Sequence, residues 1–71
     1  MRISFYEAFH DNGDGTYSPL TTIKIGGAIV TPGIDFTSDA WFGDIEIAKY
    51  IGRDLEVEHL QDGTMEIKRF C

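Results

Sequence analysis

Hydrophobic and polar residues alternate over much of the first half of the chain, with the period of two that is typical of β-strands. This alternation predicts strands over residues 2–9 and 16–25, and a shorter strand over 28–31. Residues 10–15, rich in Gly and Asp, predict a loop between the first two strands. Pro19 has no backbone N–H to donate, so we expect the first half of its strand at a sheet edge or a bulge.

The middle of the chain has more than one interpretation. Residues 34–42 predict either two short strands or an irregular loop. Residues 44–51 begin at Asp44, a good N-cap, and are followed by Gly52, a good C-terminal cap, so we predict a short helix of about two turns. A strand is the alternative, because isoleucines also alternate over this stretch, at Ile45, Ile47 and Ile51.

A hairpin at the C-terminal end is the element whose register can be derived in most detail. Val57 faces inward from the strand 54–60, and Met65 and Ile67 share that face on the returning strand, so Val57 lies opposite one of these two residues. A two-residue turn would shift the pairing by one residue and expose the apolar side. We therefore predict a three-residue loop, 61–63, ending in a glycine with left-handed backbone conformation.

These elements predict a mainly β fold for one domain, residues 1–71, with a small antiparallel sheet of four to five strands and at most one short helix, at about 44–51. We expect the sheet to roll into a partly open barrel. Residues 50–57, 62–63 and 65–67 form a pattern that resembles the corner and hairpin of SH3-like barrels. The resemblance covers less than a third of the chain and implies an SH3-like barrel architecture.

The charge balance argues against several classes of function. Twelve acidic residues oppose six basic ones, which gives a formal net charge of −6 at pH 7. Domains that bind nucleic acid carry a basic face, so we expect no direct nucleic-acid binding and no attraction to an anionic membrane. No apolar run approaches the roughly 18 residues of a membrane-spanning helix. Along the sequence the acidic residues are concentrated in residues 35–66, which contain nine of them and only two basic residues.

Cysteine content and size bear on compartment and assembly. The chain has one cysteine, Cys71, which excludes a disulfide framework and favours a reducing cytoplasm. A hydrophobic core of this size contributes little stability by itself. Burial of apolar surface between two copies of the chain would add to that stability. We therefore expect a homo-oligomer, most simply a two-fold homodimer.

The Asp-rich residues 11–17 are the candidate metal site. When Gly15 is set as the sixth position of a calcium-binding EF-hand loop, His10 and Thr21 occupy the first and twelfth positions, where carboxylates are needed. The segment is similar to the turn between strands in many β-sandwich repeats. We therefore expect a hairpin loop that uses Asn and Gly for its conformation, and no metal or cofactor. A calcium-binding module is a minor alternative.

Catalytic groups are sparse. His10 and His59 are the candidate general bases, but no nucleophile elbow, phosphate-binding loop or paired metal-ligand spacing accompanies them. Cys71 has only Lys68 and Arg69 nearby in the sequence to activate its thiol. We therefore expect a protein that is not an enzyme, and a small enzyme is the alternative.

Aromatic side chains are the remaining candidates for a functional site. The candidate partner-binding residues are Trp41, Phe42 and Tyr50, because Trp and Tyr are enriched at binding hot spots. An exposed Trp41–Phe42 pair would anchor another protein or a second copy of the chain. The alternative is that these aromatic rings cap the open ends of the barrel. The preferred function is a small non-enzymatic protein-binding domain that acts as an accessory or adaptor.

The acidic charge suggests a second function. Glu56, Glu58 and Glu66 are predicted on one exposed face of the C-terminal hairpin, beside Asp62 in its loop. Carboxylates in a row can present arginines with a field like that of phosphates. The alternative function is therefore an acidic decoy that occupies the nucleic-acid site of a DNA- or RNA-handling protein. Lys68, on the same face, argues against it. Three further acids would extend the face: Asp35, Asp39 and Asp44.

Overall fold

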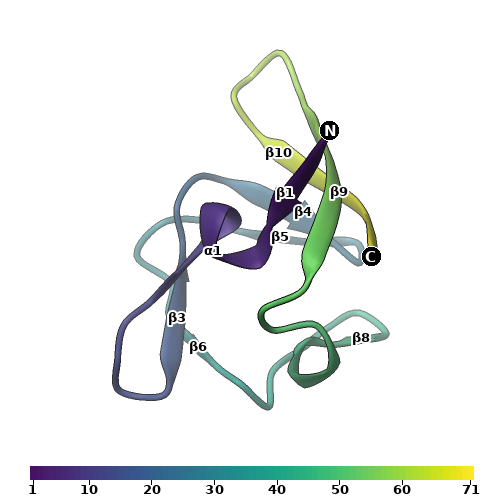
Figure 1. Ribbon diagram of the computed structural model, residues 1–71. Coiled ribbons are helices and arrows are strands. Elements are labelled where there is room, and N and C mark those ends of the chain that lie inside the picture. The colour runs from purple at the N-terminus through teal and green to yellow at the C-terminus, as the bar shows by residue number, and fades with distance from the viewer.

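The computed structural model describes all of residues 1–71 and is mainly β, as the sequence predicts (Figure 1). Its strands form three sheets, of five, three and two strands. The elements in chain order are β1 (Arg2–Ser4), α1 (Phe5–Ala8), β2 (Phe9–Asp11), β3 (Thr16–Pro19), β4 (Ile23–Ile25), β5 (Ala28–Val30), β6 (Phe36–Thr37), β7 (Trp41–Phe42), β8 (Ile45–Glu46), the 3₁₀ helix η1 (Ile47–Lys49), β9 (Asp54–His59) and β10 (Met65–Phe70).

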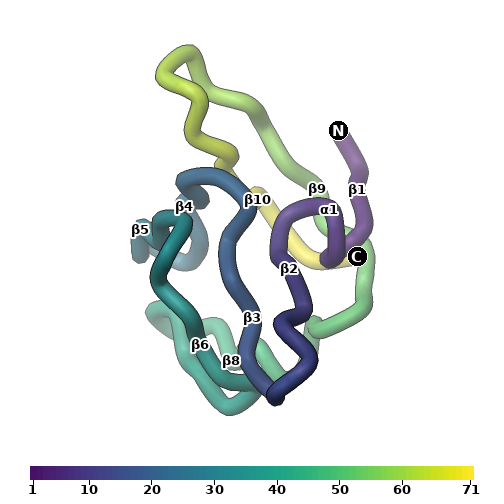
Figure 2. Tube along the Cα trace, turned by 90° about the vertical axis from the view of Figure 1, so that its left-hand side faces the viewer, coloured from purple at the N-terminus to yellow at the C-terminus, as the bar shows by residue number.

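The five-stranded sheet has the strand order β1-β9-β10-β4-β5. Neighbouring strands run antiparallel except β10 and β4, which are parallel, with Met65 opposite Ile23. The prediction of an antiparallel sheet is wrong for this pair. Most of the chain separates β4 from β10, so no tight turn dictates their relative direction. The other sheets have the orders β2-β3-β6 and β7-β8, and the strands form no closed barrel. In Figure 2, β6, β3 and β2 run side by side across the molecule.

The β9–β10 hairpin confirms the predicted register. Val57 lies opposite Ile67, and the strands are closed by a bond from the Leu60 N–H to the Thr64 carbonyl at 2.8 Å, which leaves a three-residue loop. Gly63 ends the loop with φ of 88°. A bulge between Ile67 and Arg69 then shifts the register by one residue. Because of this bulge, Phe70 lies opposite Leu55 and packs against the core.

The first nine residues differ from the predicted strand over 2–9, because a helical turn, α1, interrupts it. The Ser4 hydroxyl accepts a bond from the Tyr6 N–H, and the Glu7 carboxylate accepts one from the Ser4 N–H at 2.7 Å, which forms a capping box. Glu7 therefore caps the start of the helix. The turn places Phe5 and Ala8 in the core, fully buried.

The predicted strand over 16–25 is also divided, into β3 and β4, which lie in different sheets. Pro19 is the last residue of β3 and lies opposite Phe9 of β2. The strand on the other side of β3, β6, pairs only with Thr16 and Tyr17, so no ladder bond is lost at the proline.

The middle of the chain folds as short strands and has no α-helix at 44–51. Of the two alternatives for 34–42, the pair of short strands is confirmed, as β6 and β7. The predicted helix is wrong: β8 pairs with β7, and only η1 is helical. The Ile47 N–H bonds to the Ala40 carbonyl at 3.1 Å and its side chain is fully buried, which fixes this segment as the return of a hairpin.

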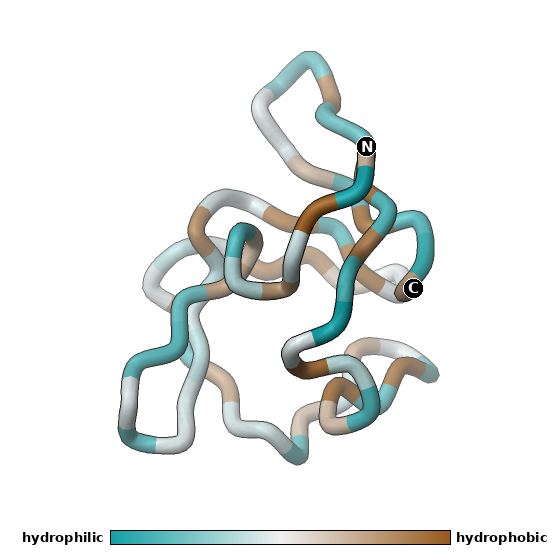
Figure 3. Tube along the Cα trace, viewed as in Figure 1, coloured by the Kyte–Doolittle hydropathy of each residue, from teal (hydrophilic) through white to brown (hydrophobic).

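The core is one cluster of thirteen buried hydrophobic residues, which every sheet helps to line. Its aromatic rings are in mutual contact: Phe5 and Phe9 are stacked with ring centroids 4.8 Å apart, and Phe36 meets Phe42 edge to face at 5.1 Å. Figure 3 shows the hydrophilic tips that surround it, including the β2–β3 loop at lower left. No helix has the length and apolar character needed to cross a membrane.

Candidate functional site

Trp41 is the most exposed aromatic residue, and it stands on a small hairpin. It is the first residue of β7 and lies opposite Glu46 of β8, with 61% of its surface exposed. Successive side chains of a strand point to opposite faces. The hairpin therefore turns Trp41 to solvent and the next residue, Phe42, into the core. Trp41 is therefore exposed, which is a condition for the anchor role that the sequence predicts.

Phe42 does not share this exposure, so the predicted exposed Trp41–Phe42 pair is wrong. Phe42 is 8% exposed and contacts Phe36 in the core. The reason is the strand alternation itself, which cannot expose two consecutive residues on one face. The buried Phe42 side chain packs the β7–β8 hairpin against the core, and of this pair only Trp41 is exposed to a partner.

Tyr50 serves the packing of the fold. Its ring stacks on Phe70, with centroids 4.1 Å apart and ring planes 18° from parallel. This contact joins the segment after η1 to the end of β10. The structure therefore does not bring Tyr50 and Trp41 into one aromatic cluster, and the sequence contained no signal for the Tyr50–Phe70 pair, because nineteen residues lie between them.

Two glycine turns fix the Trp41 hairpin to the five-stranded sheet. Gly26, in the β4–β5 turn, and Gly43, in the β7–β8 turn, have φ of 57° and 63°. A Cβ added to Gly43 would lie 2.2 Å from the Gly26 carbonyl oxygen, and one added to Gly26 would lie 2.3 Å from the Phe42 carbonyl oxygen. The two backbones therefore touch. The hairpin that carries Trp41 is held in place by this contact and by the burial of Phe42.

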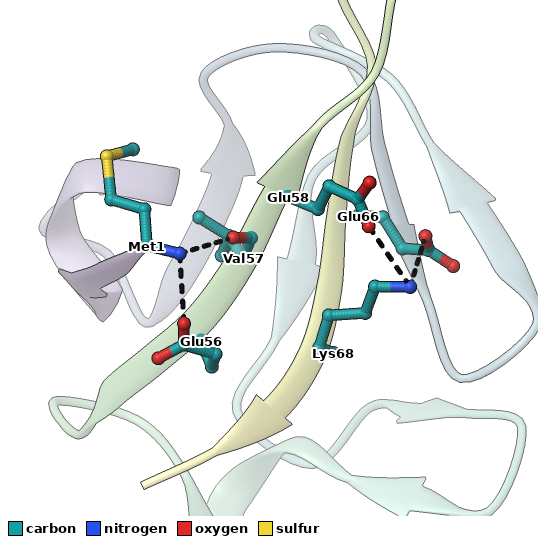
Figure 4. Close-up of polar contacts among 6 residues, drawn as sticks. All are labelled: Met1, Glu56, Val57, Glu58, Glu66 and Lys68. Carbon is teal, nitrogen blue, oxygen red and sulfur yellow. Dashed lines mark hydrogen bonds and ion pairs between the residues drawn. The ribbon is translucent and has the colours of Figure 1, made fainter.

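The acidic face predicted on the C-terminal hairpin exists, but its carboxylates are paired with cations (Figure 4). The N-terminal ammonium lies 2.9 Å from Glu56 Oε1 and also donates to the Val57 carbonyl at 2.9 Å. Lys68 lies 3.3 Å from Glu58 and 3.0 Å from Glu66. The hydrogen bond from the N-terminal ammonium lowers the pKa of Glu56, and the one from Lys68 lowers the pKa of Glu66.

The strand neighbours explain this neutralisation. β9 lies between β1 and β10, and both supply cations: Arg2 lies 3.0 Å from Asp54, and Lys68 bridges Glu58 and Glu66. Asp62 has a different role, because it accepts a bond from the Thr64 N–H at 2.9 Å within the hairpin loop, which lowers its pKa. The sequence places these acids correctly on one face. It does not show which cations stand beside them, since strand order depends on long-range contacts.

Net charge is distributed unevenly over the folded molecule. The five-stranded sheet with its own turns, residues 1–4, 23–30 and 53–71, carries five acids and five basic side chains; we call it the neutral sheet. The remaining residues, 5–22 and 31–52, carry seven acids and one lysine; we call them the acidic half. The whole formal charge of −6 therefore falls on the acidic half, which includes Trp41.

The Asp-rich loop is a hairpin loop, as the sequence predicts, between the antiparallel β2 and β3. Its carboxylates bind their own backbone: Asp11 accepts from the Gly13 N–H at 2.9 Å, and Asp14 from the Thr16 N–H at 3.0 Å. The bond from the Thr16 hydroxyl is the main cause that lowers the pKa of Asp14. No three His, Cys, Asp or Glu side chains are grouped so that they could hold a metal ion.

The remaining candidate residues lie in different parts of the chain's secondary structure. His10 lies on β2 and His59 on β9, in different sheets, and both side chains are exposed. Cys71 is a free, partly exposed thiol. The surface has no pocket. The chain matches no protein-family model, and neither a curated protein nor a solved structure shows significant similarity to it.

Proposed function

We propose that this chain is a small non-enzymatic protein-binding domain, and that it docks through Trp41 onto a basic segment of another protein. The observation that carries the proposal is the exposure of Trp41, at 61%, on the β7–β8 hairpin. The next residue in the hairpin, Phe42, is buried in the core. A rigidly placed tryptophan loses little entropy on binding and is the residue type most enriched at hot spots.

The charged residues around Trp41 indicate which kind of partner would bind there. Asp39 and Asp44, close to Trp41 in the chain, are exposed and form no ion pair, and Glu46 opposite it is bound only by Lys49 at 3.5 Å. Arginine and lysine bind well to the face of an indole ring, and nearby carboxylates complete the attraction. The lone cysteine supports a cytoplasmic location for this domain.

The acidic decoy is the weaker alternative for this structure. Its central carboxylates, Glu56, Glu58 and Glu66, are already bound to cations of the same chain. An arginine of a partner would have to displace those cations, so the face presents a smaller net field than phosphates do. The hairpin acids therefore support structure more than recognition.

The experiment is partner capture with wild-type and Trp41→Ala bait, read by quantitative mass spectrometry. Leu20→Ala is the matched control, because Leu20 is also exposed, at 54%, and lies in the acidic half. We expect a protein with a basic segment to be captured by wild type and by Leu20→Ala and lost with Trp41→Ala. A peptide of that segment should then change the fluorescence of the single tryptophan, and high salt should weaken its binding.

Two results would contradict the proposal. One is a partner that binds Trp41→Ala as well as it binds wild type. The other is a partner whose binding is abolished by Glu58→Lys and unaffected at Trp41, which would favour the decoy.

A further inference from the structure

The two edges of the five-stranded sheet differ in how they are protected. At the β1 edge, the Ser4 N–H is already bound by Glu7, and Arg2 places a guanidinium beside Asp54. The N-terminal ammonium, directly before β1, is bound to Glu56 of the neighbouring β9. Charged side chains and a covering turn are devices that keep a sheet edge from pairing with another strand.

The β5 edge has no such protection. Gly26 and Gly27 form a two-residue turn, so Ile25 and Ala28 are the hydrogen-bonded pair that closes the hairpin. Hydrogen-bonded and non-hydrogen-bonded pairs alternate along the two strands from this pair onward. The N–H and C=O groups of Ile29, the next residue, therefore point away from β4, to the unpaired side of β5. Ile29 is 65% exposed, the highest value among the large hydrophobic residues, and no residue from 26 to 34 is charged.

We propose that the β5 edge pairs with β5 of a second copy of this chain, antiparallel and about a two-fold axis at Ile29. The two Ile29 residues would exchange both of their backbone hydrogen bonds, with Cα atoms about 5.5 Å apart and side chains adjacent on one face. The paired sheets would then continue through both molecules. In Figure 2, β5 lies at the left-hand margin of the molecule, next to β4.

Charge identifies a second copy as the partner for this edge. The neutral sheet can approach itself without net repulsion, whereas two acidic halves repel each other. Within the paired strands the only charged side chains are those of the two Lys24 residues, since Lys24 lies opposite Ile29. Three strand spacings, about 14 Å, separate them. This separation exceeds the screening length of about 8 Å at physiological salt.

The paired edge is short, so the dimer is weak and depends on concentration. It also has a salt dependence of its own. Salt screens the repulsion between the two acidic halves and strengthens self-association, whereas it weakens binding of a basic partner at Trp41. The two interactions can therefore be separated in one set of buffers.

The test is sedimentation equilibrium of the purified chain over a concentration series, at low and high salt. The variant is Ile29→Lys, and the matched control is Ile34→Lys, because Ile34 is also exposed, at 51%, and lies outside the sheet. We expect wild type and Ile34→Lys to dimerise, more strongly at high salt, and Ile29→Lys to remain a monomer. Circular dichroism checks that each variant is folded.

A second measurement tests the backbone pairing itself. The chain is short enough for chemical synthesis, so the Ile29 nitrogen can be methylated with its side chain unchanged. We expect this change to abolish the dimer, and the Ile29 amide of the wild type to become protected from hydrogen exchange as concentration rises. A strict monomer at every concentration, a dimer that survives N-methylation, or a monomer whose β5 edge captures only a strand of a different protein would each overturn the proposal.

Discussion

Gly43 is a residue at which the structure leaves no room for a side chain. Its Cβ would meet a backbone carbonyl oxygen, which cannot move aside, and its φ of 63° strains any L side chain. We expect Gly43→Ala to lower the free energy of unfolding by about 2–4 kcal/mol, from the backbone strain and the steric clash together. Urea denaturation measures this value.

Gly63→Ala is the matched control for this prediction. Gly63 also has a positive φ, 88°, but nothing lies within 4 Å of its added Cβ. We expect a loss of only about 1–2 kcal/mol, from the backbone conformation alone. Equal losses for the two variants would show that the contact between the glycine turns contributes nothing to stability.

At the scale of elements, β7 presents one exposed face, at Trp41, and one buried face, at Phe42. Phe42→Ala should cost about 3–5 kcal/mol of unfolding free energy, because it opens a cavity among the aromatic rings. Trp41→Ala should change stability by no more than about 0.5 kcal/mol, because an exposed side chain away from the core contributes little. Thermal denaturation compares the two variants. A large stability loss for Trp41→Ala would mean that the indole packs against the protein and is not available to a partner.

Two carboxylates of the β9–β10 hairpin, Glu56 paired with the N-terminal ammonium and Glu66 paired with Lys68, should make the stability of the fold depend on pH. The pKa values of Glu56 and Glu66 lie below the ordinary 4.5, so the folded state holds fewer protons there than the unfolded state. Their stabilising effect is present above pH 4.5 and is lost as the pH falls through the lowered values. We expect Glu56→Gln to make the melting temperature fall less steeply below pH 4.5.

Asp44→Asn serves as the control, because Asp44 is exposed and forms no ion pair or hydrogen bond in the structure. It should keep the wild-type dependence on pH. If Glu56→Gln keeps the full dependence as well, the pairing with the N-terminal ammonium does not stabilise the fold in solution.

The elements that could be predicted from sequence are those fixed by local signals. The β9–β10 hairpin followed from alternation and one glycine, because a three-residue loop was the one that kept Val57 on the apolar side. The capping box of Ser4 and Glu7 was also a local signal, but α1 is too short to show helical periodicity. At 44–51 the helical and strand patterns overlap, and the outcome depended on β7, which is itself two residues long.

At the scale of the whole molecule, linear order was a poor guide to charge. Residues 35–66 are the most acidic stretch of the sequence, yet folding places its second part in the neutral sheet, among cations from both ends of the chain. Trp41 could be selected as a candidate from residue type alone. The burial of Phe42, the stacking of Tyr50 on Phe70 and the identity of the uncharged sheet edge depend on long-range contacts that only the fold supplies.

The central position of β10 also constrains how the chain is made. β10 lies between β9 and β4 in the sheet, although it is the last of the five strands in chain order. Until β10 has been synthesised, β4 and β5 have no strand that links them to β1 and β9. The five-stranded sheet therefore forms only after synthesis has passed this strand, in one late step that joins distant segments. A chain that ends before β10 would leave β4 paired only with β5, and the open side of β4 would be an exposed strand edge that quality-control proteases can recognise.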